Sequence, residues 1–363
     1  MTLEGKGFFI WQIRNCEDGD ADAIANLAFQ AGFSHVLIKI ADDVYAYNID
    51  QNTFIDLVPP VAQALRGYGI LVYGWHYVYG NDPIGEADIA IQRVEELELD
   101  GYVIDAEAPY KADGKELAAD YFMTRLRSGL PDFPIGLSSY RYPTYHPQIP
   151  WQVFLEKCDF NMPQHYWIDA HNPGEQLIRS LDEFKALNPY RPLMPTGVAF
   201  IEGGWAPTTD DITEFMETAQ DLDLTAVNFW EWSNCRRNLP EVWDTIKDYQ
   251  WVVGTLDIAQ RYIAALNTHD PQQVVSFYRH NAIHVTSDRT VQGEPDILDW
   301  YETFFNQLLP DAAFILIDYS GEGETRRLNW SATSSAGNVE NGNDVLGFMG
   351  DEIVYHFTFF SIS

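Results

Sequence analysis

The chain is poor in basic residues. Among its 363 residues, 22 are lysine or arginine and 54 are aspartate or glutamate, which gives a formal net charge of −32 at pH 7. The acidic excess extends over both halves of the chain, so neither half carries the basic surface that nucleic acid or an anionic membrane attracts. We therefore expect no nucleic acid and no membrane among the partners of this protein.

Cysteine and long apolar runs are also scarce. Cys16, Cys158 and Cys235 are widely separated and none is part of a C-x-x-C motif, which predicts free thiols rather than a disulfide framework or a zinc site. No run of about 18 apolar residues is present to span a membrane. The first residues, MTLEGKGFFIWQIRN, lack the pattern of a signal peptide. These absences predict a cytoplasmic protein, and we expect no cofactor and no metal.

Short apolar runs alternate with amphipathic segments up to about residue 250. One such segment spans residues 20–32, with Asp20 as a helix cap and Gly32 as a stop. The predicted strands are residues 8–13, 34–40, 70–79, 101–107, 134–140, 159–167, 192–200 and 226–232. Eight strands alternating with helices over about 250 residues are typical of a (β/α)8 barrel, an α/β fold. An open doubly wound sheet is the alternative, but no glycine-rich phosphate loop follows the first strand.

The pattern changes close to Gly254. Two helical segments come first, and a strand over residues 282–287 and an amphipathic helix over residues 294–310 follow. Several strand-like runs with glycine and asparagine turns come last, which predicts an α+β domain. The expected organisation is therefore a barrel over residues 1–253 and a second domain over residues 254–363.

The stretch GYVIDAEAPY, residues 101–110, places two acids directly after an apolar run. Side chains alternate between the two faces of a strand, so Asp105 and Glu107 share one face. In a (β/α)8 barrel the carboxyl ends of the strands form the mouth, where active sites lie. A solvated loop is the alternative in so acidic a chain, but two acids that follow an apolar strand favour a functional pair.

Polar and aromatic residues stand at the ends of the other predicted strands. Aromatic rings stack on sugar faces, and glycosidic cleavage needs a carboxylic acid together with a second group that stabilises the developing cation. Core packing is the alternative for each aromatic residue taken singly. The predicted substrate-binding residues are Trp11, Gln12, Lys39, Trp75, His76, Tyr77, Tyr140, Gln164, Tyr166, Trp230 and Glu231.

The first region resembles the lysozyme-type muramidases of glycoside hydrolase family 25 and related glycosidase-like barrels. The resemblance rests on SHVLIKIADD, GILVYGWHYVYG, VIDAEAP and VNFWEWS, and it covers most of residues 7–235. It implies that Glu107 is the general acid/base and that Asp105 assists it, as in hydrolases where the aspartate of D-x-E orients the acetamido group of the substrate. The muramidases carry a further aspartate at the end of the first strand, where this chain reads FIWQIRN.

The second region resembles the SnoaL-like members of the nuclear transport factor 2-like (NTF2-like) superfamily. The resemblance covers about residues 255–363 and rests on LDIAQRYIAALNTHD, FYRHNAIHV, QGEPDILDWYETFF and GDEIVYHFTFFSIS. It implies a cone-shaped domain in which a curved sheet wraps around helices, with a pocket in its mouth, and a homodimer that pairs through the open sheet face. The residues expected to line that pocket are His284, Asp288, Tyr301, Trp330 and His356.

Three functions follow as hypotheses. The first is a retaining-type glycoside hydrolase that acts on a glycan through Glu107 and Asp105. The second is a non-catalytic scaffold that binds a glycan or another small molecule and is dimerised by the second domain. The third places isomerase or cyclase chemistry in that domain. Asp105, Glu107, His76 and Glu231 are also candidate metal ligands, but no spacing typical of a metal site supports this role.

Overall fold

A computed structural model describes residues 3–252, 257–321, 323–349 and 352–363. The chain divides into two compact units, residues 1–255 and residues 256–363. The boundary that the sequence predicts close to Gly254 lies outside the described residues. Each unit is described by itself below.

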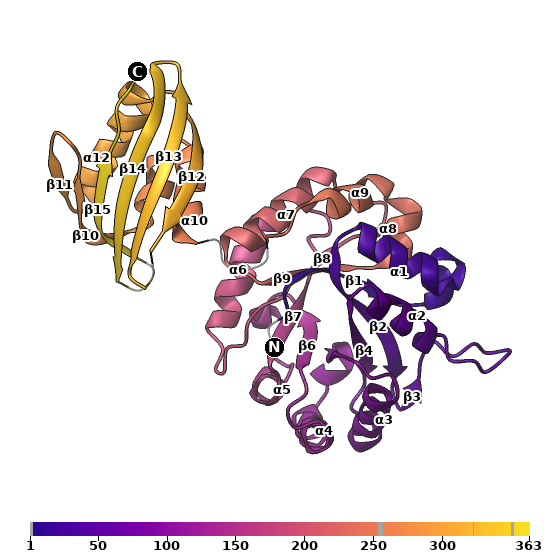
Figure 1. Cartoon of the computed structure of the whole chain (residues 1–363). Helices are drawn as coiled ribbons and strands as arrows, with labels where there is room; N and C mark the ends of the chain where they lie inside the picture. Colours follow the sequence, from indigo (N-terminus) through magenta and orange to yellow (C-terminus); the bar gives the residue numbers. More distant parts are fainter. Residues whose placement is uncertain (1–2, 253–256, 322, 350–351) are drawn as a thin grey trace. The chain divides into compact units, whose positions relative to one another are not determined.

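The first unit is a closed barrel of parallel strands (Figure 1). Around the barrel each strand pairs with the next, and β1 closes the ring by pairing with both β2 and β9. The eight strands are β1 (Gly5–Ile10), β2 (Phe33–Asp42), β4 (Leu71–Val78), β5 (Gly101–Ala106), β6 (Ile135–Tyr140), β7 (Phe160–His165), β8 (Thr196–Val198) and β9 (Ala226–Trp230). The barrel expected from the sequence is confirmed.

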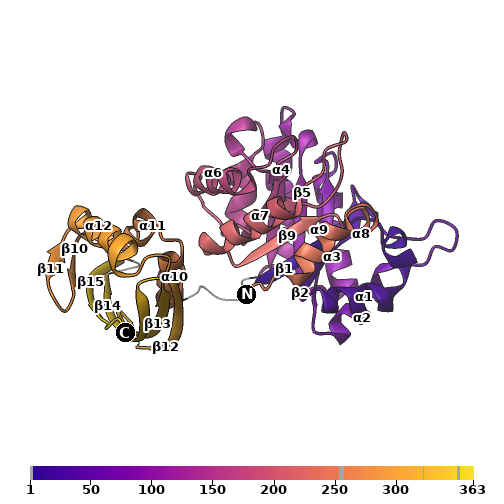
Figure 2. The ribbon, with the colours of Figure 1, turned by 90° about the horizontal axis from the view of Figure 1, so that it is seen from above.

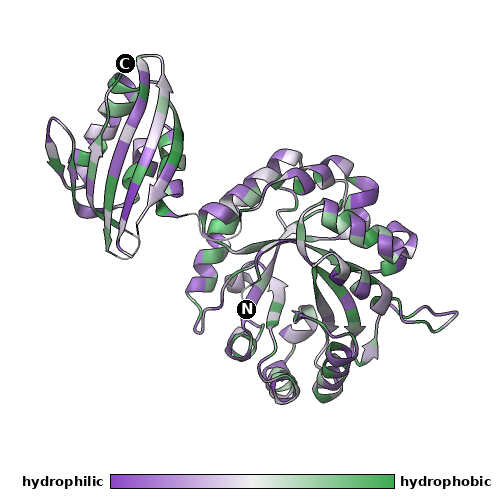
Figure 3. Cartoon of the chain, in the orientation of Figure 1, coloured by the Kyte–Doolittle hydropathy of each residue, from purple (hydrophilic) through white to green (hydrophobic). Residues whose placement is uncertain are grey.

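Helices form an outer ring around these strands, as Figures 1 and 2 show. They are α1 (Ala21–Gln30), α2 (Val58–Gly67), α3 (Pro83–Glu96), α4 (Lys115–Gly129), α5 (Trp151–Lys157), α6 (Pro173–Lys185), α7 (Thr209–Asp221), α8 (Trp232–Asn238) and α9 (Pro240–Asp248). Figure 3 shows hydrophobic and hydrophilic residues alternating along them, as expected for helices with one face against a sheet. Asp20 caps α1 as predicted, and Thr208 with Asp211 forms a capping box on α7.

The two faces of each strand have different surroundings. The outward side chains and the helices form the large apolar core, to which Phe8, Ile104 and Phe229 belong. The inward side chains form a smaller apolar cluster inside the barrel, which includes Phe9 and Val103. Because the faces alternate along a strand, every second residue at the carboxyl end of a strand points into the barrel mouth.

Some elements differ from those predicted. The strand predicted over residues 192–200 is only three residues long, because Pro192 and Pro195 have no N–H to donate to a neighbouring strand. A short strand, β3 (Tyr45–Ala46), pairs antiparallel with the end of β2 and was not predicted. It opens a loop that continues to α2 and projects from the barrel in Figure 1.

The second unit is a six-stranded sheet with helices on one side (Figure 2). Its helices are α10 (Ile258–Asn267), α11 (Pro271–Val275) and α12 (Glu294–Thr303), and its strands are β10 (Tyr278–Val285), β11 (Thr290–Gln292), β12 (Ala313–Ser320), β13 (Thr325–Ser334), β14 (Gly337–Met349) and β15 (Glu352–Phe359). The strand order is β11-β10-β15-β14-β13-β12, and only β10 and β15 run parallel to each other. The α+β arrangement expected from the sequence is confirmed, while β11 was not predicted and the end of the helix predicted up to Pro310 is a π-helical turn, Phe304–Leu308.

Among the described residues, no helix is both long enough and apolar enough to cross a membrane.

Candidate functional site

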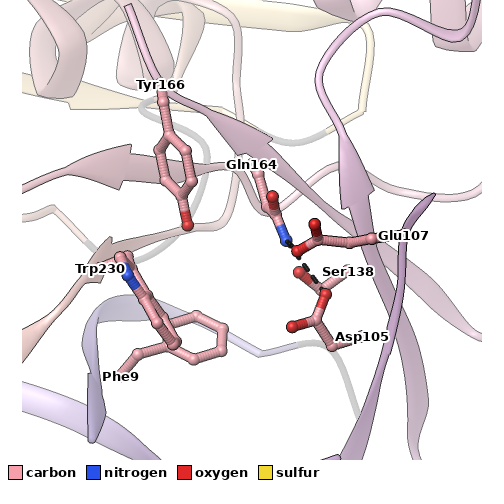
Figure 4. A pocket seen from close by; sticks show the side chains of 7 residues that line it. All are labelled: Phe9, Asp105, Glu107, Ser138, Gln164, Tyr166 and Trp230. Carbon is pink, nitrogen blue, oxygen red and sulfur yellow. Dashed lines mark hydrogen bonds between the residues drawn. The ribbon is translucent and has the colours of Figure 1, made fainter. Parts of the chain in front are cut away.

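A cavity of about 120 Å³ opens at the carboxyl ends of the barrel strands. The seven residues that line it are drawn in Figure 4: Phe9, Asp105, Glu107, Ser138, Gln164, Tyr166 and Trp230. The two acids and Gln164 lie together on one side, and the rings of Phe9, Tyr166 and Trp230 lie on the other. Five of these residues are among those predicted from the sequence.

The strand β5 directs both acids into the cavity. Asp105 pairs with Tyr77 of β4 and with Ser138 of β6, so it stands in the middle of this wall of the barrel. Glu107 follows the strand by one residue and precedes the 3-10 turn Ala108–Lys111. Two residues further along the same face, it lies nearer the opening and is half-buried, whereas Asp105 is 7% exposed.

One amide group connects the two acids. The Nε2 atom of Gln164, on β7, donates one hydrogen bond to Oδ1 of Asp105 at 3.0 Å and another to Oε1 of Glu107 at 2.7 Å (Figure 4). A primary amide nitrogen carries two hydrogens, so it can serve both carboxyl groups at once. Gln164 therefore fixes the positions of both acids relative to each other.

The surroundings of Asp105 favour its protonated form. Burial, the charge of Glu107 and a hydrogen bond with Glu107 raise the pKa of Asp105 well above its usual value, and the nearby Lys39 opposes this shift only in part. A buried carboxyl beside a second carboxyl holds a proton because a second negative charge there is strongly disfavoured. The pair therefore retains a proton at a pH where an exposed aspartate has lost its own.

Aromatic rings form the opposite wall. The ring of Trp230 lies 5.6 Å from that of Phe9 and 5.1 Å from that of Trp75, whose Nε1 donates to the carbonyl of Ile10. Trp11 lies further out, 6.4 Å from Trp230 and 44% exposed. These contacts hold Trp230 in place as a flat apolar surface facing the acids. The peptide bond that follows Trp230 is cis.

Lys39 on β2 and Tyr77 on β4 lie close to the acids. The Lys39 ammonium lies 4.8 Å from the centre of the Trp75 ring and 4.4 Å from that of Tyr47, and it forms an ion pair with Asp42. Burial, followed by the charges of Glu107 and Asp105, raises the pKa of Tyr77, so its hydroxyl stays a hydrogen-bond donor. Lys39, Trp75 and Tyr77 thus support the cavity wall, although they are not among the residues that line it.

Four further predicted residues are also outside the cavity lining. His76 points out of the barrel, where it contacts the Tyr102 hydroxyl and the carbonyl of Asp43, because it alternates with the inward Trp75 and Tyr77. Glu231 caps α8 by accepting from the backbone N–H groups of Ser233 and Asn234. His76 and Glu231 therefore do not contribute to the cavity lining, and both make structural contacts instead.

The other two belong to the surroundings of the mouth. Tyr140 stacks on His146 at 3.8 Å, with the Lys111 ammonium 3.8 Å from the centre of its ring. Gln12 donates to the Tyr47 hydroxyl and lines a separate hollow. The prediction missed Phe9, although the alternation of side chains through Trp11 places it on the inward face.

No group of three or more histidine, cysteine, aspartate or glutamate side chains is suited to hold a metal ion in the part of the chain that the structure describes. His76 contacts the Tyr102 hydroxyl and Glu231 caps α8, and neither lines the cavity with Asp105 and Glu107.

A second cluster of polar side chains is buried in the second unit. The Tyr301 hydroxyl is 2.7 Å from the hydroxyls of both Tyr262 and Tyr278, and the Tyr278 hydroxyl is 2.5 Å from Nδ1 of His356. On the other side of the imidazole, Nε2 of His356 lies 3.4 Å from Oδ2 of the buried Asp344. Hydrogen bonds join the three tyrosines and His356 into a chain, and the Asp344 carboxylate lies near its end without a hydrogen bond to Nε2 of His356 among the described residues.

His284 lies against this chain. Its ring stacks on that of His356 with centroids 4.1 Å apart and planes 11° apart, and neither of its nitrogens has a hydrogen-bond partner among the described residues. Burial, with the neighbouring His356 and Arg289, lowers the pKa of His284 well below its usual value. The predicted pocket residues His284, Tyr301, Trp330 and His356 are all buried, whereas Asp288 is exposed on the turn after β10.

Comparison with known proteins identifies the second unit. Residues 259–360 match the family model described as "SnoaL-like domain". This part of the chain is a SnoaL-like domain. The match lies entirely within the second unit, so the resemblance of the barrel to glycoside hydrolase family 25 stays a prediction. A comparison with curated proteins gives no match.

Several solved structures are similar over a share of the chain about as large as the SnoaL-like domain. An NTF2-like protein from Cytophaga hutchinsonii ATCC 33406 is 14% identical, with 31% of this chain and 95% of that chain covered and a TM-score of 0.26. A SnoaL-like family protein from Agrobacterium tumefaciens strain C58 is 25% identical, with 29% and 94% covered and a TM-score of 0.26. A protein with a ketosteroid isomerase-like fold from Catenulispora acidiphila DSM 44928 is 15% identical, with 30% and 87% covered and a TM-score of 0.27.

Proposed function

We propose that the barrel is a glycoside hydrolase in which Glu107 is the general acid/base and Asp105 assists it. The observation that supports this proposal is the pair of carboxyl groups held by the single Gln164 amide, opposite the Trp230 ring, in a cavity at the barrel mouth. A sugar ring offers an apolar face that stacks on an indole and hydroxyl groups that need polar partners. This cavity supplies both kinds of surface.

The spacing of the acids does not suit an inverting glycosidase. Inverting glycosidases keep their carboxyl groups about 6.5–9.5 Å apart to admit a water molecule, whereas retaining enzymes bring them to about 5–5.5 Å. Here both oxygen atoms touch the same Gln164 nitrogen, which leaves no room for a water molecule between the two groups. Both acids also project from one strand to one side of the cavity, so they do not flank a bond from opposite faces.

This one-sided arrangement suits a substrate that carries its own nucleophile. With a 2-acetamido sugar bound, Asp105 passes its proton to Glu107 and becomes a carboxylate. The amide oxygen of the sugar then attacks C1 while Glu107 donates that proton to the departing glycosidic oxygen, and the C1–O bond breaks. Asp105 accepts a hydrogen bond from the amide N–H, which stabilises the positive charge that develops on the amide. Water then attacks C1, Glu107 takes the proton of that water, and the acetamido group is restored.

Glu107→Gln tests this mechanism. The purified full chain is incubated with chromogenic glycosides, among them N-acetylglucosaminides and their analogues without the acetamido group. We expect cleavage only of the acetamido substrates and a loss of about 100-fold or more in kcat with Glu107→Gln, because protonation of the leaving group contributes about 10²–10⁴-fold. Glu217→Gln, which alters an exposed acid on α7, is the control. Absence of hydrolysis by the wild-type protein across the panel refutes the proposal and favours a barrel that binds glycans without cutting them.

A second candidate function belongs to the SnoaL-like domain, where the tyrosine–histidine chain beside the Asp344 carboxylate favours proton-transfer chemistry of the isomerase or cyclase type. A histidine bonded to a hydroxyl and close to a carboxylate is a suitable general base. Conversion of a small hydrophobic ketone by the full chain, lost in His356→Gln and retained in Glu107→Gln, is the expected result for this function. Retained conversion in His356→Gln excludes it.

The open face of the SnoaL-like sheet supports a homodimer. The helices pack on the other face, and Ile315, Tyr355 and Phe359 are 61%, 42% and 45% exposed on their strands. Apolar side chains exposed on a sheet face are typical of an interface. Sedimentation of the full chain is expected to show a dimer that Tyr355→Asp converts to a monomer, and a wild-type monomer at micromolar concentration refutes this expectation.

A further inference from the structure

A second hollow lies at the ends of β1 and β2, beside the barrel mouth. It has a volume of about 400 Å³ and is lined by Gln12, Arg14, Ala46, Tyr47, Asn48, Ile49, Gln51 and Phe54. Most of these residues belong to the loop that projects from the barrel between β2 and α2 (Figure 1). The lining combines side-chain N–H donors with two aromatic rings, and no carboxylate takes part in it.

Phe54 is held in an unfavourable state. Its side chain is 82% exposed, and its φ angle of 58° lies in the left-handed region, which bulky residues rarely adopt. The turn is closed by a bond from the Phe54 N–H to the carbonyl of Asp50 and by one from the Asp50 N–H to the carbonyl of Ile55. Neither the strained backbone nor the exposed ring contributes to the stability of the free protein. The exposed ring is available for contact with a ligand.

The hollow and the cavity have no lining residue in common, but Trp11 lies next to both. Trp11, which lies 6.4 Å from the cavity residue Trp230, is followed directly by Gln12, which lines the hollow. Asn48 of the hollow donates a hydrogen bond to the carbonyl of Trp11 at 3.2 Å and another to that of Lys39 at 2.8 Å. A molecule that passes over the exposed ring of Trp11 therefore reaches both sites.

The cavity alone is small. Its volume of about 120 Å³ corresponds to about four water molecules, at roughly 30 Å³ for each, which is less than a whole acetamido sugar occupies. The rest of a longer substrate must lie outside it. The rings that lead outward, Trp11 and then Phe54, are exposed as stacking surfaces for sugar faces.

We propose that this hollow binds further sugar units of the substrate. The sugar whose bond is cleaved lies at Asp105 and Glu107, so the substrate is an oligosaccharide or polysaccharide rather than a single glycoside. Trp11 and Phe54 are the stacking residues, and Gln12 and Arg14 face the hydroxyl groups, while Asn48 positions the backbone of Trp11. This inference rests on the proposed hydrolase function. The neutral and basic lining favours a glycan over an acidic peptide segment, because a peptide of that kind would meet the strong negative charge of the rest of the chain.

Chain-length dependence of binding tests the inference. The full chain with Glu107→Gln, which prevents cleavage, is titrated calorimetrically with β-1,4-linked N-acetylglucosamine oligomers of two and six units. We expect the six-unit oligomer to bind at least tenfold more tightly than the two-unit oligomer. Phe54→Asn is expected to weaken binding of the six-unit oligomer by about three- to tenfold and to leave that of the two-unit oligomer unchanged. Trp11→Ala is expected to weaken binding of both oligomers, because the Trp11 ring contacts Trp230. Asparagine tolerates the left-handed backbone, so Phe54→Asn removes the ring without disturbing the turn.

Phe29→Ala is the matched control, because Phe29 is an exposed aromatic residue on α1 outside the hollow, 56% exposed. Equal affinity for both lengths, or a six-unit affinity that neither Trp11→Ala nor Phe54→Asn changes, overturns the inference and leaves the hydrolase proposal intact. Absence of binding at either length refutes the proposed acetamido substrate, and this inference fails with it. If Phe54→Asn leaves the affinity for glycans unchanged but weakens association with another protein, the hollow belongs to a protein partner instead.

Discussion

Replacing Asp105 with asparagine is expected to change how the stability of the barrel depends on pH. In the folded chain, burial and the adjacent Glu107 raise the pKa of Asp105 well above its usual value. In the unfolded chain the same carboxyl titrates at about 3.9. Between these two values the folded chain therefore binds one more proton than the unfolded chain, so the free energy of unfolding falls as the pH rises through this interval.

The magnitude follows from that one proton. Each pH unit within the interval lowers the free energy of unfolding by about 1.4 kcal/mol, so the loss between pH 5 and pH 7 reaches about 3 kcal/mol if Asp105 keeps its proton at pH 7. Asparagine has nearly the same shape and can still accept the hydrogen bond from Gln164, but it does not titrate. The free energy of unfolding of Asp105→Asn minus that of the wild type is therefore expected to be about 3 kcal/mol larger at pH 7 than at pH 5.

Thermal unfolding of the full chain at half-unit pH steps measures the difference. A change of about 1 kcal/mol shifts the midpoint by about 2–4 °C in a unit of this size. The difference between Asp105→Asn and the wild type is expected to grow from pH 5 to pH 7 in the transition that belongs to the barrel. Asp132→Asn, which alters an exposed acid between α4 and β6, is the control and is expected to show no such growth. A difference that stays constant with pH refutes the stated protonation of Asp105.

Three other substitutions have expected outcomes of a different kind. In the wild type the hydrogen bond from Gln164 lowers the pKa of Asp105, so Gln164→Leu is expected to raise that pKa. The basic limb of the pH profile of kcat/KM is therefore expected to move to higher pH while kcat falls by about 10–100-fold, and an unchanged profile contradicts this. His284→Phe removes a buried imidazole whose folded pKa is depressed, so the stability that the wild-type SnoaL-like domain loses as the pH falls below about 6.5 is expected to be retained in the variant, as chemical unfolding at pH 5 and pH 7.5 will show. Lys6→Met leaves the carbonyls of Ile246, Lys247 and Tyr249 without their ammonium donor and is expected to cost about 2–4 kcal/mol, measured as a lower midpoint in thermal unfolding, with Lys185→Met on α6 as the control.

Much of the barrel could be predicted from the sequence, because its evidence is local. Alternating apolar runs and capped helices follow from residues a few positions apart, and the alternation of side chains along β5 put Asp105 and Glu107 on one face. The errors occur where local rules are ambiguous. His76 was chosen because it stands at a strand end, but its neighbours Trp75 and Tyr77 already occupy the inward face. Glu231 follows a strand directly, and that position equally suits the cap of the next helix.

The contacts between strands could not be predicted in this way. Gln164 meets Asp105 and Glu107 on one side of the cavity although it stands more than fifty residues further along the chain. Whether it reaches them depends on the register between β5, β6 and β7, which no short segment specifies. In the SnoaL-like domain, the pairing of β10 with β15 likewise places His284 directly beside His356.

The sequence by itself determined the order of elements, the α/β character of the first unit, the separate α+β character of the second, and the common direction of the two acids, because each depends on the period of side chains along a single helix or strand. Only the tertiary structure decided which strand ends form the cavity, that one amide holds both acids, and that Asp105 is buried deeply enough to keep a proton. The physical reason is that distance across a barrel and exclusion of water from its mouth depend on all eight strands closing together, and burial is what raises the pKa of a carboxyl group.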